Sequence, residues 1–469
     1  MDIDNRIKRL AEADKAHIWH PFTQMKDWAQ ADPVIITGAR GCFLKDINGK
    51  WYLDGVSSMW VNIFGHRKKE IDEAIAAQLG RVAHSTLLGL AGEPSIELAE
   101  KLAALMEESF GPFAKSGGRR LTRIFYSDDG STAVEVALKM AFQYWQHRGV
   151  KEKTRFISLE NGYHGDTLGA VSVGGVGIFH KAFAPLLFKT HKAPSPYCYR
   201  CMLGRTFPEC ALACAGVVEE ILKAHAGEVA GLILEPLVQA AGGMIVFPRG
   251  YVAKIRELCD RYGVLMIADE VATGFGRTGK MFACQHEEVA PDIICLSKGI
   301  TGGYLPLAVT IATEEIYGAF LGGYAELKTF FHGHSYTGNA LACAAALATL
   351  GLFEKEKAFF EQMRAKTELL GGWLRDMSGQ AQVGEARGIG LMAGVEMVMD
   401  KKTKEPFPWH RRMGWEVALR ALEKGLFIRP LGNVIVIMPP LSISMDNLKA
   451  MLGIIRESMD EALRAPGPV

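Results

Sequence analysis

The amino-acid sequence predicts an α/β protein with one large domain, built on a mostly parallel sheet flanked by helices, and one smaller discontinuous α+β domain. The first observation is length, because 469 residues exceed one typical domain. The second is the alternation of short apolar runs with helical patterns between Leu121 and Ser335, which a sheet covered on both faces requires. The third is that both chain ends lack this alternation. We therefore expect residues 1–65 and 339–469 to form the small domain and residues 66–338 the large domain.

The first hundred residues predict a helix, a β hairpin and two further helices. Residues 3–15 have the pattern of an amphipathic helix. Strand-like runs at residues 33–46 and 50–61 flank a turn at residues 46–49, whose Asn-Gly pair suits a tight hairpin. Helical patterns follow at residues 68–82 and 95–108.

Six short apolar runs make up the central alternation, and their length suits strands that are buried on both faces. We expect these strands at residues 123–127, 155–160, 231–237, 264–271, 292–298 and 307–313. Helical patterns between them include residues 131–149 and 250–263, and a long helix at residues 340–363 leads out of the sheet. In the remaining α+β unit we expect strands at residues 388–398 and 426–440 and helices at residues 411–425 and 445–464.

Composition and charge indicate a globular protein that acts on small molecules. Hydrophobic residues make up 49% and charged residues 22% of the chain, and the net charge is +1. This balance gives no electrostatic reason to expect nucleic acid or a membrane surface as partner. The charged N-terminus lacks the apolar core of a signal peptide, and no apolar run approaches transmembrane length, so we expect a cytoplasmic protein.

Four of the nine cysteines form a local cluster, while the other five lie in apolar or mixed segments and are expected to be reduced thiols in or near the core. A CxxC motif is followed after eight residues by CxxxC, formed by Cys198, Cys201, Cys210 and Cys214. This spacing could hold zinc or an iron–sulfur cluster. The interval is short for a zinc ribbon and contains no histidine, which favours a reduced surface insertion. We assign no metal ligand, and metal binding by the cluster remains the alternative.

Two apolar runs between Val264 and Gly303 each deliver an ionisable residue at their C-terminal end, Asp269 in the first and Lys298 in the second. The carboxyl ends of parallel strands line the ligand crevice of an α/β sheet. A lysine there can form a Schiff base with a carbonyl compound such as pyridoxal phosphate (PLP), and Asp269 would then pair with the pyridinium nitrogen. The alternative is that both residues are solvated at element ends, with Asp269 as a cap. The neighbouring motifs favour the cofactor site.

A second motif places a strand, then Asp128-Asp129-Gly130-Ser131, then a helix. Free backbone N–H groups and the helix dipole converge at such a helix N-terminus and favour an anion. We assign Gly130 and Ser131 to the cofactor phosphate, although Ser131 could equally be a simple N-cap.

Four further residues near strand ends are candidates for the same site. Tyr163, in the segment NGYHGDT, can stack on one face of a planar ring, and Val271 can cover the other face unless it is ordinary core. Asp166 could orient neighbouring groups. Glu235 ends the run GLILEP and either binds the cofactor or substrate or compensates a buried cation.

The segments EPLVQAAGG, ADEVATGFGRTGKMFA, LSKGITGGYLPLA and HGHSYTGN, in this order, resemble class III PLP-dependent aminotransferases of fold type I over essentially the whole chain. The pair DEVxTGFGRTG and SKGxxGG is highly specific. The resemblance implies PLP as cofactor, with Lys298 and Asp269 in the roles given above. It further implies that Ser335, where the family usually has threonine, reaches the phosphate of a neighbouring subunit. The functional unit would then be a homodimer with shared active sites.

Further segments, including HIWHPFTQM, DGVSSMW and FIRPLGN, resemble the biotin-pathway branch of this family, which converts 8-amino-7-oxononanoate to 7,8-diaminononanoate. This resemblance implies that Phe22, Trp60 and Arg429 line the substrate site and that Arg429 binds the keto substrate's carboxylate. Three departures are expected at the pocket, because Phe22 and Val436 replace tyrosines and Met59 replaces a tryptophan. They favour the Bacillus-like branch, in which lysine is the amino donor in place of S-adenosylmethionine.

Three other functions compete with this prediction. Another class III ω-aminotransferase, acting on diamines or β-amino acids with pyruvate or a similar keto acid, would share every cofactor residue and differ only in the substrate pocket. A non-catalytic binding protein on the same fold is disfavoured by the presence of Lys298 and Asp269. A nicotinamide-dependent oxidoreductase is disfavoured because no GxGxxG follows the first strand of the alternation.

Overall fold

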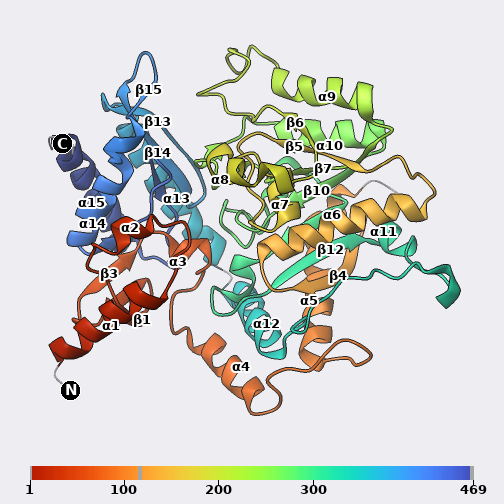
Figure 1. The fold of residues 1–469 in the computed structure, drawn as a ribbon, viewed down its shortest axis with the longest axis horizontal. Coiled ribbons are helices and arrows are strands. Elements are labelled where there is room, and N and C mark those ends of the chain that lie inside the picture. Colours follow the sequence, from red (N-terminus) through yellow and green to blue (C-terminus); the bar gives the residue numbers. More distant parts are fainter. Residues whose placement is uncertain (1–2, 115–118, 357, 465–469) are drawn as a thin grey trace.

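A seven-stranded mixed sheet occupies the middle of the chain (Figure 1). The computed structural model describes residues 3–114, 119–356 and 358–464. The strands lie in the order β4-β12-β11-β10-β7-β5-β6, and within this described sheet β12 alone runs antiparallel to its neighbours. The predicted α/β class with a mostly parallel sheet is confirmed. The strands are β4 (Leu121–Ser127), β5 (Arg155–Leu159), β6 (His191–Ala193), β7 (Val229–Leu234), β10 (Leu265–Asp269), β11 (Ile293–Leu296) and β12 (Ala308–Thr313).

Six of these strands overlap the apolar runs of the sequence, and β6 is the strand that the sequence analysis missed. It has only three residues, and two of them are polar, so it carries no strand-like pattern. It pairs in parallel with β5 at the edge of the sheet. An edge strand has one neighbour and is less enclosed than a central strand, so it does not need a continuous apolar run.

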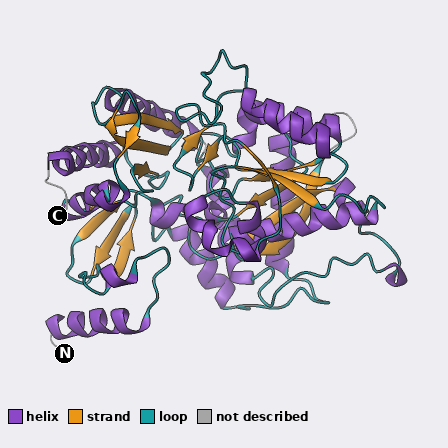
Figure 2. Ribbon diagram, turned by 45° about the horizontal axis from the view of Figure 1, so that its top comes forward, coloured by secondary structure: helices purple, strands orange, loops and turns teal. Residues whose placement is uncertain are grey.

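Two apolar cores enclose the sheet, and helices cover both of its faces (Figure 2). Alternate residues of β10 divide between the cores, because Met266 and Ala268 belong to one and Ile267 to the other. The second core is packed largely by α6. The helices of this part are α4 (Lys69–Leu79), α5 (Glu93–Phe110), α6 (Gly130–His147), α7 (Leu168–Val173), α8 (Gly177–His180), α9 (Ala213–His225), α10 (Tyr251–Tyr262), α11 (Glu314–Gly318) and α12 (Ala340–Lys355).

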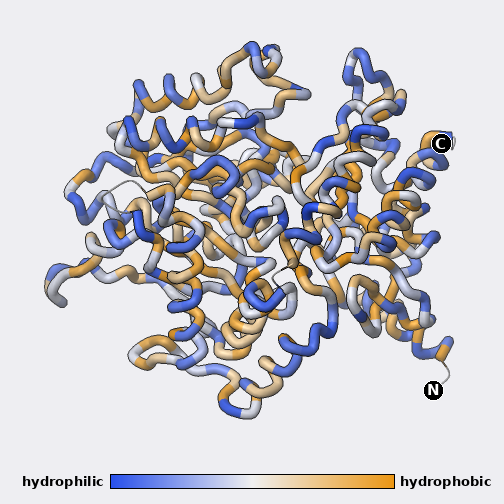
Figure 3. Tube along the Cα trace, turned by 180° about the vertical axis from the view of Figure 1, so that it is seen from behind, coloured by the Kyte–Doolittle hydropathy of each residue, from blue (hydrophilic) through white to orange (hydrophobic). Residues whose placement is uncertain are grey.

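Hydropathy follows this layering, since hydrophobic stretches run through the middle of the molecule and hydrophilic stretches are frequent along its periphery (Figure 3). Among the described helices, none is both long enough and apolar enough to span a membrane.

The two ends of the chain come together on one side of the molecule, on the left in Figure 1. β16 (Leu426–Phe427) pairs in parallel with β3 (Trp51–Asp54), which joins the C-terminal segment to the N-terminal sheet. Residues 1–2 and 465–469, the outer ends of the predicted small domain, lie outside the described residues. The remaining elements are α1 (Ile3–His17), α2 (Met25–Trp28), β1 (Ile36–Arg40), β2 (Phe43–Asp46), α3 (Ser57–Trp60), β8 (Val238–Gln239), β9 (Ile245–Val246), α13 (Phe359–Met377), β13 (Val383–Ile389), β14 (Met392–Asp400), β15 (Glu405–Pro406), α14 (Met413–Glu423), β17 (Val434–Ile437) and α15 (Met445–Arg464).

The N-terminal strands differ in detail from the prediction. The hairpin around residues 46–49 is confirmed, since β2 and β3 pair antiparallel. However, the run at residues 33–46 forms two strands, because Gly41 adopts φ +55° in a tight turn between β1 and β2. The second run ends as a strand at Asp54 and continues into the short turn α3.

The single helix expected at residues 340–363 is two helices, α12 and α13. Aromatic side chains pack together where the chain changes direction. The ring of Phe64 lies 4.9 Å from that of Phe353 on α12 and 5.3 Å from that of Phe359 on α13. The rings of Phe353 and Phe359 therefore both meet Phe64 in the core.

Arg277 ties the segment after β10 to both ends of the chain. Its side chain is fully buried, and its guanidinium donates to the carbonyl oxygens of Pro439 (2.7 Å) and Asn62 (2.6 Å). Burial lowers the pKa of Arg277. These charge-assisted bonds hold the chain ends against the strand that carries Asp269.

Candidate active site

Four consecutive strands of the sheet deliver the predicted residues to one cavity. In the order β11, β10, β7, β5, their carboxyl ends lead to Lys298, Asp269, Glu235 and Tyr163. These side chains line a cavity of about 740 Å³, together with Trp60, Gly130, Ser131 and Val271. The four residues therefore meet at one edge of the sheet, as their positions after apolar runs predict.

Asp269 is buried at the end of β10 and is held by two donors. His164 Nδ1 lies 2.7 Å from Asp269 Oδ2, and the Val271 N–H donates to Oδ1 at 3.1 Å. An ionised carboxylate only accepts hydrogen bonds, so Nδ1 must carry the proton. His164 Nε2 is buried without a partner among the described residues. His164 thus orients a carboxylate that is directed into the cavity.

Glu235 is the second buried carboxyl group of the cavity. It accepts hydrogen bonds from the N–H groups of Tyr163 (2.9 Å) and Ala240 (3.0 Å). Burial, reinforced by the nearby charge of Asp269, raises the pKa of Glu235 to about 8. The pair therefore resists carrying two negative charges at neutral pH.

Lys298 stands at the cavity wall just beyond β11, with its backbone in the left-handed region at φ +45°. Its Nζ lies 5.5 Å from the centre of the Trp60 ring. Burial lowers the pKa of Lys298, although Asp269 and Glu235 oppose that shift. A lowered pKa increases the neutral, nucleophilic fraction of the amine.

The segment that carries Trp60 is a left-handed turn that sequence reasoning did not find. Ser57, Ser58, Met59 and Trp60 all have positive φ, between 47° and 75°. Such backbone costs roughly 1–2 kcal/mol per residue outside glycine. Asp54 compensates by accepting from Ser58 Oγ at 2.7 Å, and Ser57 Oγ donates to the carbonyl oxygen of Met438 at 2.6 Å. These hydrogen bonds stabilise the strained turn and so keep Trp60 beside Lys298.

The N-terminus of α6 lines one side of the cavity. Asp129 is the N-cap and accepts from the Thr132 N–H at 2.9 Å, which leaves the N–H groups of Gly130 and Ser131 without partners among the described residues. Ser131 is therefore not the cap. Its hydroxyl lies 2.8 Å from Thr167 Oγ1 and accepts from the Thr167 N–H at 2.9 Å.

Gly130 is the residue that lets α6 approach β10. A Cβ atom at this position would lie 2.5 Å from Val271 Cγ1, well inside van der Waals contact. Val271 is half-buried and lines the cavity, so glycine is required where the start of α6 meets it.

Aromatic rings lead from the cavity towards the chain ends. Tyr163 donates its hydroxyl to Asp166 at 2.7 Å, and its ring lies 6.1 Å from that of Phe179. Phe179 in turn contacts Phe22 at 5.3 Å. Arg429 donates to the carbonyl oxygen of Phe22 at 3.0 Å and has no carboxylate partner among the described residues. Burial lowers the pKa of Arg429.

The residues expected at the substrate pocket divide into four groups. Trp60 lines the cavity, whereas Phe22 and Arg429 connect to it through Phe179. Met59 is exposed beside Trp60. The prediction that Val436 lies at the pocket is wrong. Val436 is fully buried in the middle of β17, opposite Gly394 of β14, and packs in the core of the C-terminal sheet.

Ser335 does not line the cavity of its own chain and is exposed. Its carbonyl oxygen lies 2.6 Å from His84 Nε2. The four cysteines of the cluster are free thiols. Cys198 is exposed, and the other three are half-buried. No three of its described sulfur atoms all lie within 4.8 Å of one another.

The residues fit a cofactor with a phosphate, a cationic ring nitrogen and a reactive carbonyl, which are the functional groups of PLP. The cradle at Gly130 and Ser131 offers unpartnered N–H groups, Asp269 offers a buried carboxylate, and Lys298 offers an amine with a lowered pKa. The sequence analysis missed His164, although it directly follows Tyr163 in the NGYHGDT segment.

Comparison with known proteins places this architecture in a family. The class III aminotransferase family matches residues 25–459, and the chain belongs to it. It is a PLP-dependent transaminase. It is 53% identical to the adenosylmethionine-8-amino-7-oxononanoate aminotransferase of Geobacter sulfurreducens over 97% of this chain and 98% of that one.

Two solved structures have the same fold. The adenosylmethionine-8-amino-7-oxononanoate aminotransferase of Methanocaldococcus jannaschii matches with a TM-score of 0.90 and 47% identity, over 97% of this chain and 99% of that chain. An amine transaminase from an uncultivated Pseudomonas species, solved in a PLP-bound form, matches with a TM-score of 0.88 and 38% identity over 95% and 99%.

We expect Gly130→Ala to weaken cofactor retention. The added Cβ must push Val271 into the cavity or move the start of α6, which costs about 1–3 kcal/mol. PLP affinity, measured by absorbance titration, should fall by about tenfold or more. Gly216→Ala on the exposed face of α9 is the control, because its Cβ meets nothing within 4 Å. Equal PLP affinity in both variants would contradict this account of the cradle.

We expect Glu235 to make the cofactor-free protein less stable as pH rises. Its folded pKa of about 8 exceeds the ordinary value of 4.5, so between these values the folded state binds the extra proton. The free energy of unfolding then falls with rising pH, by up to about 1.4 kcal/mol per unit. Glu235→Gln should flatten this dependence in denaturation experiments between about pH 5 and 8. Glu73→Gln, at an exposed site, should leave the slope as in the wild type.

Proposed function

We propose that this enzyme transfers an amino group to 8-amino-7-oxononanoate and so forms 7,8-diaminononanoate, a step of biotin biosynthesis. The observation that carries the proposal is the near full-length match, at 53% identity, to a relative whose name includes this keto acid. The position of Arg429 is consistent with a substrate that has a carboxylate far from its reacting ketone. Its guanidinium is half-buried near the aromatic rings and has no carboxylate partner among the described residues.

We assign the cofactor contacts to residues of the cavity. Gly130 and Ser131 would bind the phosphate, Tyr163 and Val271 would cover the two ring faces, and Lys298 would hold the carbonyl carbon covalently. Bound PLP supplies an electron-accepting ring that stabilises the substrate carbon from which a proton is lost. Asp269, oriented by His164, would keep the ring nitrogen protonated.

Proton transfer is the task we assign to Lys298. Once an amine substrate has displaced it, its Nζ can accept the substrate's C–H proton and return it to the cofactor side. The lowered pKa of Lys298 favours the neutral form of this base. The ring of Trp60, 5.5 Å from Nζ, limits where the amine can move. The second half-reaction uses the same groups in reverse.

We propose lysine as the amino donor in place of S-adenosylmethionine. Phe22 and Met59 support this, because they present apolar side chains where the adenosylmethionine-using branch is expected to have tyrosine and tryptophan. Val436 gives no support to lysine as the donor, since it is buried in the core. Lysine and the keto acid each have a reactive end far from a carboxylate, so Arg429 could anchor both in turn.

The second candidate is an amine ω-transaminase. It is favoured by the likeness to the amine transaminase from an uncultivated Pseudomonas species, which has the same fold at 38% identity. Such an enzyme would use the same strand-end residues and would not require Arg429 to bind a substrate carboxylate.

We expect L-lysine alone to convert the bound cofactor to its amino form in a single turnover, seen as a change in the visible absorption spectrum. Adding 8-amino-7-oxononanoate should restore the original spectrum. Lys298→Ala should slow the conversion on the order of 10³-fold, since it removes the proton-transferring amine. Lys449→Ala, on the exposed face of α15, is the control.

Conversion by S-adenosylmethionine but not by lysine would refute the proposed donor. Restoration by pyruvate but not by 8-amino-7-oxononanoate would favour the amine ω-transaminase.

We also propose that the functional unit is a homodimer. Segment 84–90 lies beside segment 327–336, where the rings of His84 and Tyr336 are 5.0 Å apart. Both segments expose large apolar side chains, including Leu88 (86% exposed) and Phe331 (74%). A patch of this kind on a single chain is typical of a protein–protein interface. In such a dimer, Ser335 could reach the phosphate of the neighbouring subunit.

We expect sedimentation to give a mass twice that of the 51.3 kDa chain. Phe331→Asp places a charge in the proposed interface and should shift the protein towards monomers and lower its PLP content. Leu419→Asp, an exposed position on α14, is the control. A wild-type protein that sediments as a monomer would contradict the proposed dimer.

A further inference from the structure

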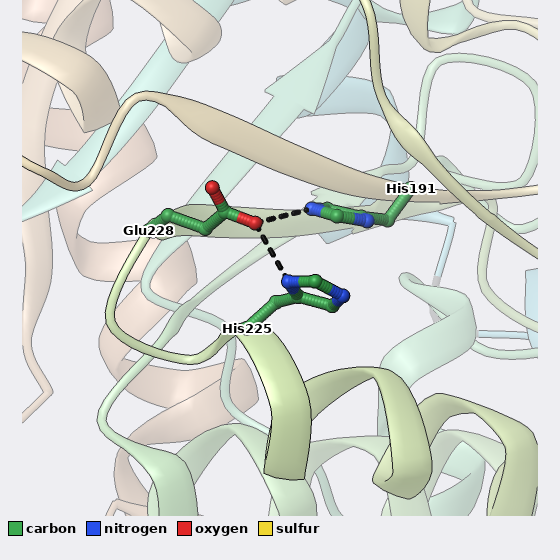
Figure 4. Close-up of side chains that lie close together, drawn as sticks. All are labelled: His191, His225 and Glu228. Atoms are coloured by element: carbon green, nitrogen blue, oxygen red, sulfur yellow. Dashed lines mark hydrogen bonds and ion pairs between the residues drawn. The ribbon is translucent and has the colours of Figure 1, made fainter.

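Two histidines and a glutamate meet at the edge of the central sheet, and none of them lines the cavity (Figure 4). His191 begins β6, His225 ends α9, and Glu228 directly precedes β7. One nitrogen of each ring is directed at the same oxygen, Glu228 Oε1. The distance is 3.2 Å from His191 Nε2 and 2.8 Å from His225 Nδ1. All three ligand atoms lie within 4.8 Å of one another.

We propose that these three side chains bind a divalent transition-metal ion of the zinc class. Two imidazole nitrogens and one carboxylate oxygen are donors that zinc accepts at about 2.0–2.2 Å, with water in a fourth position. Ligand atoms around a tetrahedral ion with such bonds lie about 3.3–3.5 Å apart. The observed separations of 3.2 and 2.8 Å need only small side-chain adjustments to reach that geometry.

The backbone fixes the positions of these ligands before an ion arrives. His225 and Glu228 lie on either side of a tight turn, in which the Glu228 N–H donates to the His225 carbonyl oxygen at 2.9 Å. The Glu228 carbonyl oxygen accepts from the N–H groups of Thr154 (2.9 Å) and Arg155 (2.8 Å). The His191 ring stacks on that of His225, with centroids 4.5 Å apart and planes at 26°.

The arrangement of the three side chains suits coordination. Without an ion, each ring points a nitrogen at the same carboxylate oxygen, Glu228 Oε1. An ion is bound by neutral rings and takes the place of both N–H groups. All three side chains are partly exposed, so an ion can enter with its water. The C-terminal end of α9 adds a favourable field for positive charge.

The ion would join the two ends of one long segment of the chain. His191 and His225 enclose residues 192–224, which include the four-cysteine cluster and α9. By linking the ends of this segment to Glu228, the ion would hold α9 against the edge of the sheet. The proposed ion is therefore structural and independent of the transamination chemistry.

Calorimetric titration of the holoenzyme with Zn²⁺ tests this proposal. We expect one ion per chain and an increase in Tm when the ion is added. His225→Ala should weaken binding by at least about tenfold and abolish the increase in Tm. Glu228→Gln, which keeps the side-chain volume and removes the charge, should also weaken binding. His410→Ala, at an exposed position, is the matched control and should bind Zn²⁺ like the wild type.

The four cysteines are the competing zinc ligands. Zinc binding that persists in His225→Ala and disappears when all four cysteines are replaced by serine would overturn the proposal. So would a wild-type holoenzyme that binds no Zn²⁺ stoichiometrically. Unchanged transaminase activity of His225→Ala without added zinc would show that the variant is folded, so that its loss of binding supports the assigned ligands.

Discussion

The buried carboxylate of Asp269 is the constraint on which the rest of the site depends. An isolated charge at the end of a buried strand is costly, so it must have donors. His164 and the Val271 N–H supply them from two different segments. Glu235 is then a second acid in the same cavity, and its pKa is raised by its burial and further by the charge of Asp269. The carboxylate of Asp269 therefore favours a cationic group of the ligand at this point of the cavity.

The second constraint is backbone strain on the opposite wall. Four consecutive residues with positive φ, from Ser57 to Trp60, would not persist in an isolated peptide. They persist here because Asp54 and the carbonyl oxygen of Met438 bind both serine hydroxyls. Arg277 connects the same region to the segment after β10. The position of Trp60 beside Lys298 is thus supported by the packing of both chain ends.

The parts of the site that sequence could predict are those governed by local pattern. Lys298, Asp269 and Glu235 follow short apolar runs, and parallel strand ends must meet at one edge. The pairing of His164 with Asp269 spans 105 residues, and no local pattern encodes it. The same limit applies to His191, which reaches His225 and Glu228 because β6 joins the sheet edge. The position of Val436 does not follow from its apolar neighbours, because they indicate a buried strand but not whether a side chain meets the core or a pocket.

The residues that we propose for cofactor chemistry and those that we propose for substrate choice lie in separate parts of the structure. The cofactor-side residues lie at the ends of four neighbouring strands, where a shift of one residue would turn them into the core. Phe22 and Arg429 come from opposite ends of the chain and are linked to each other by one hydrogen bond. Under the proposed assignment, changes there would alter the substrate while the contacts of Asp269 stay intact. This separation explains how proteins with TM-scores of 0.88 and 0.90 to this chain can bear the names of different aminotransferases.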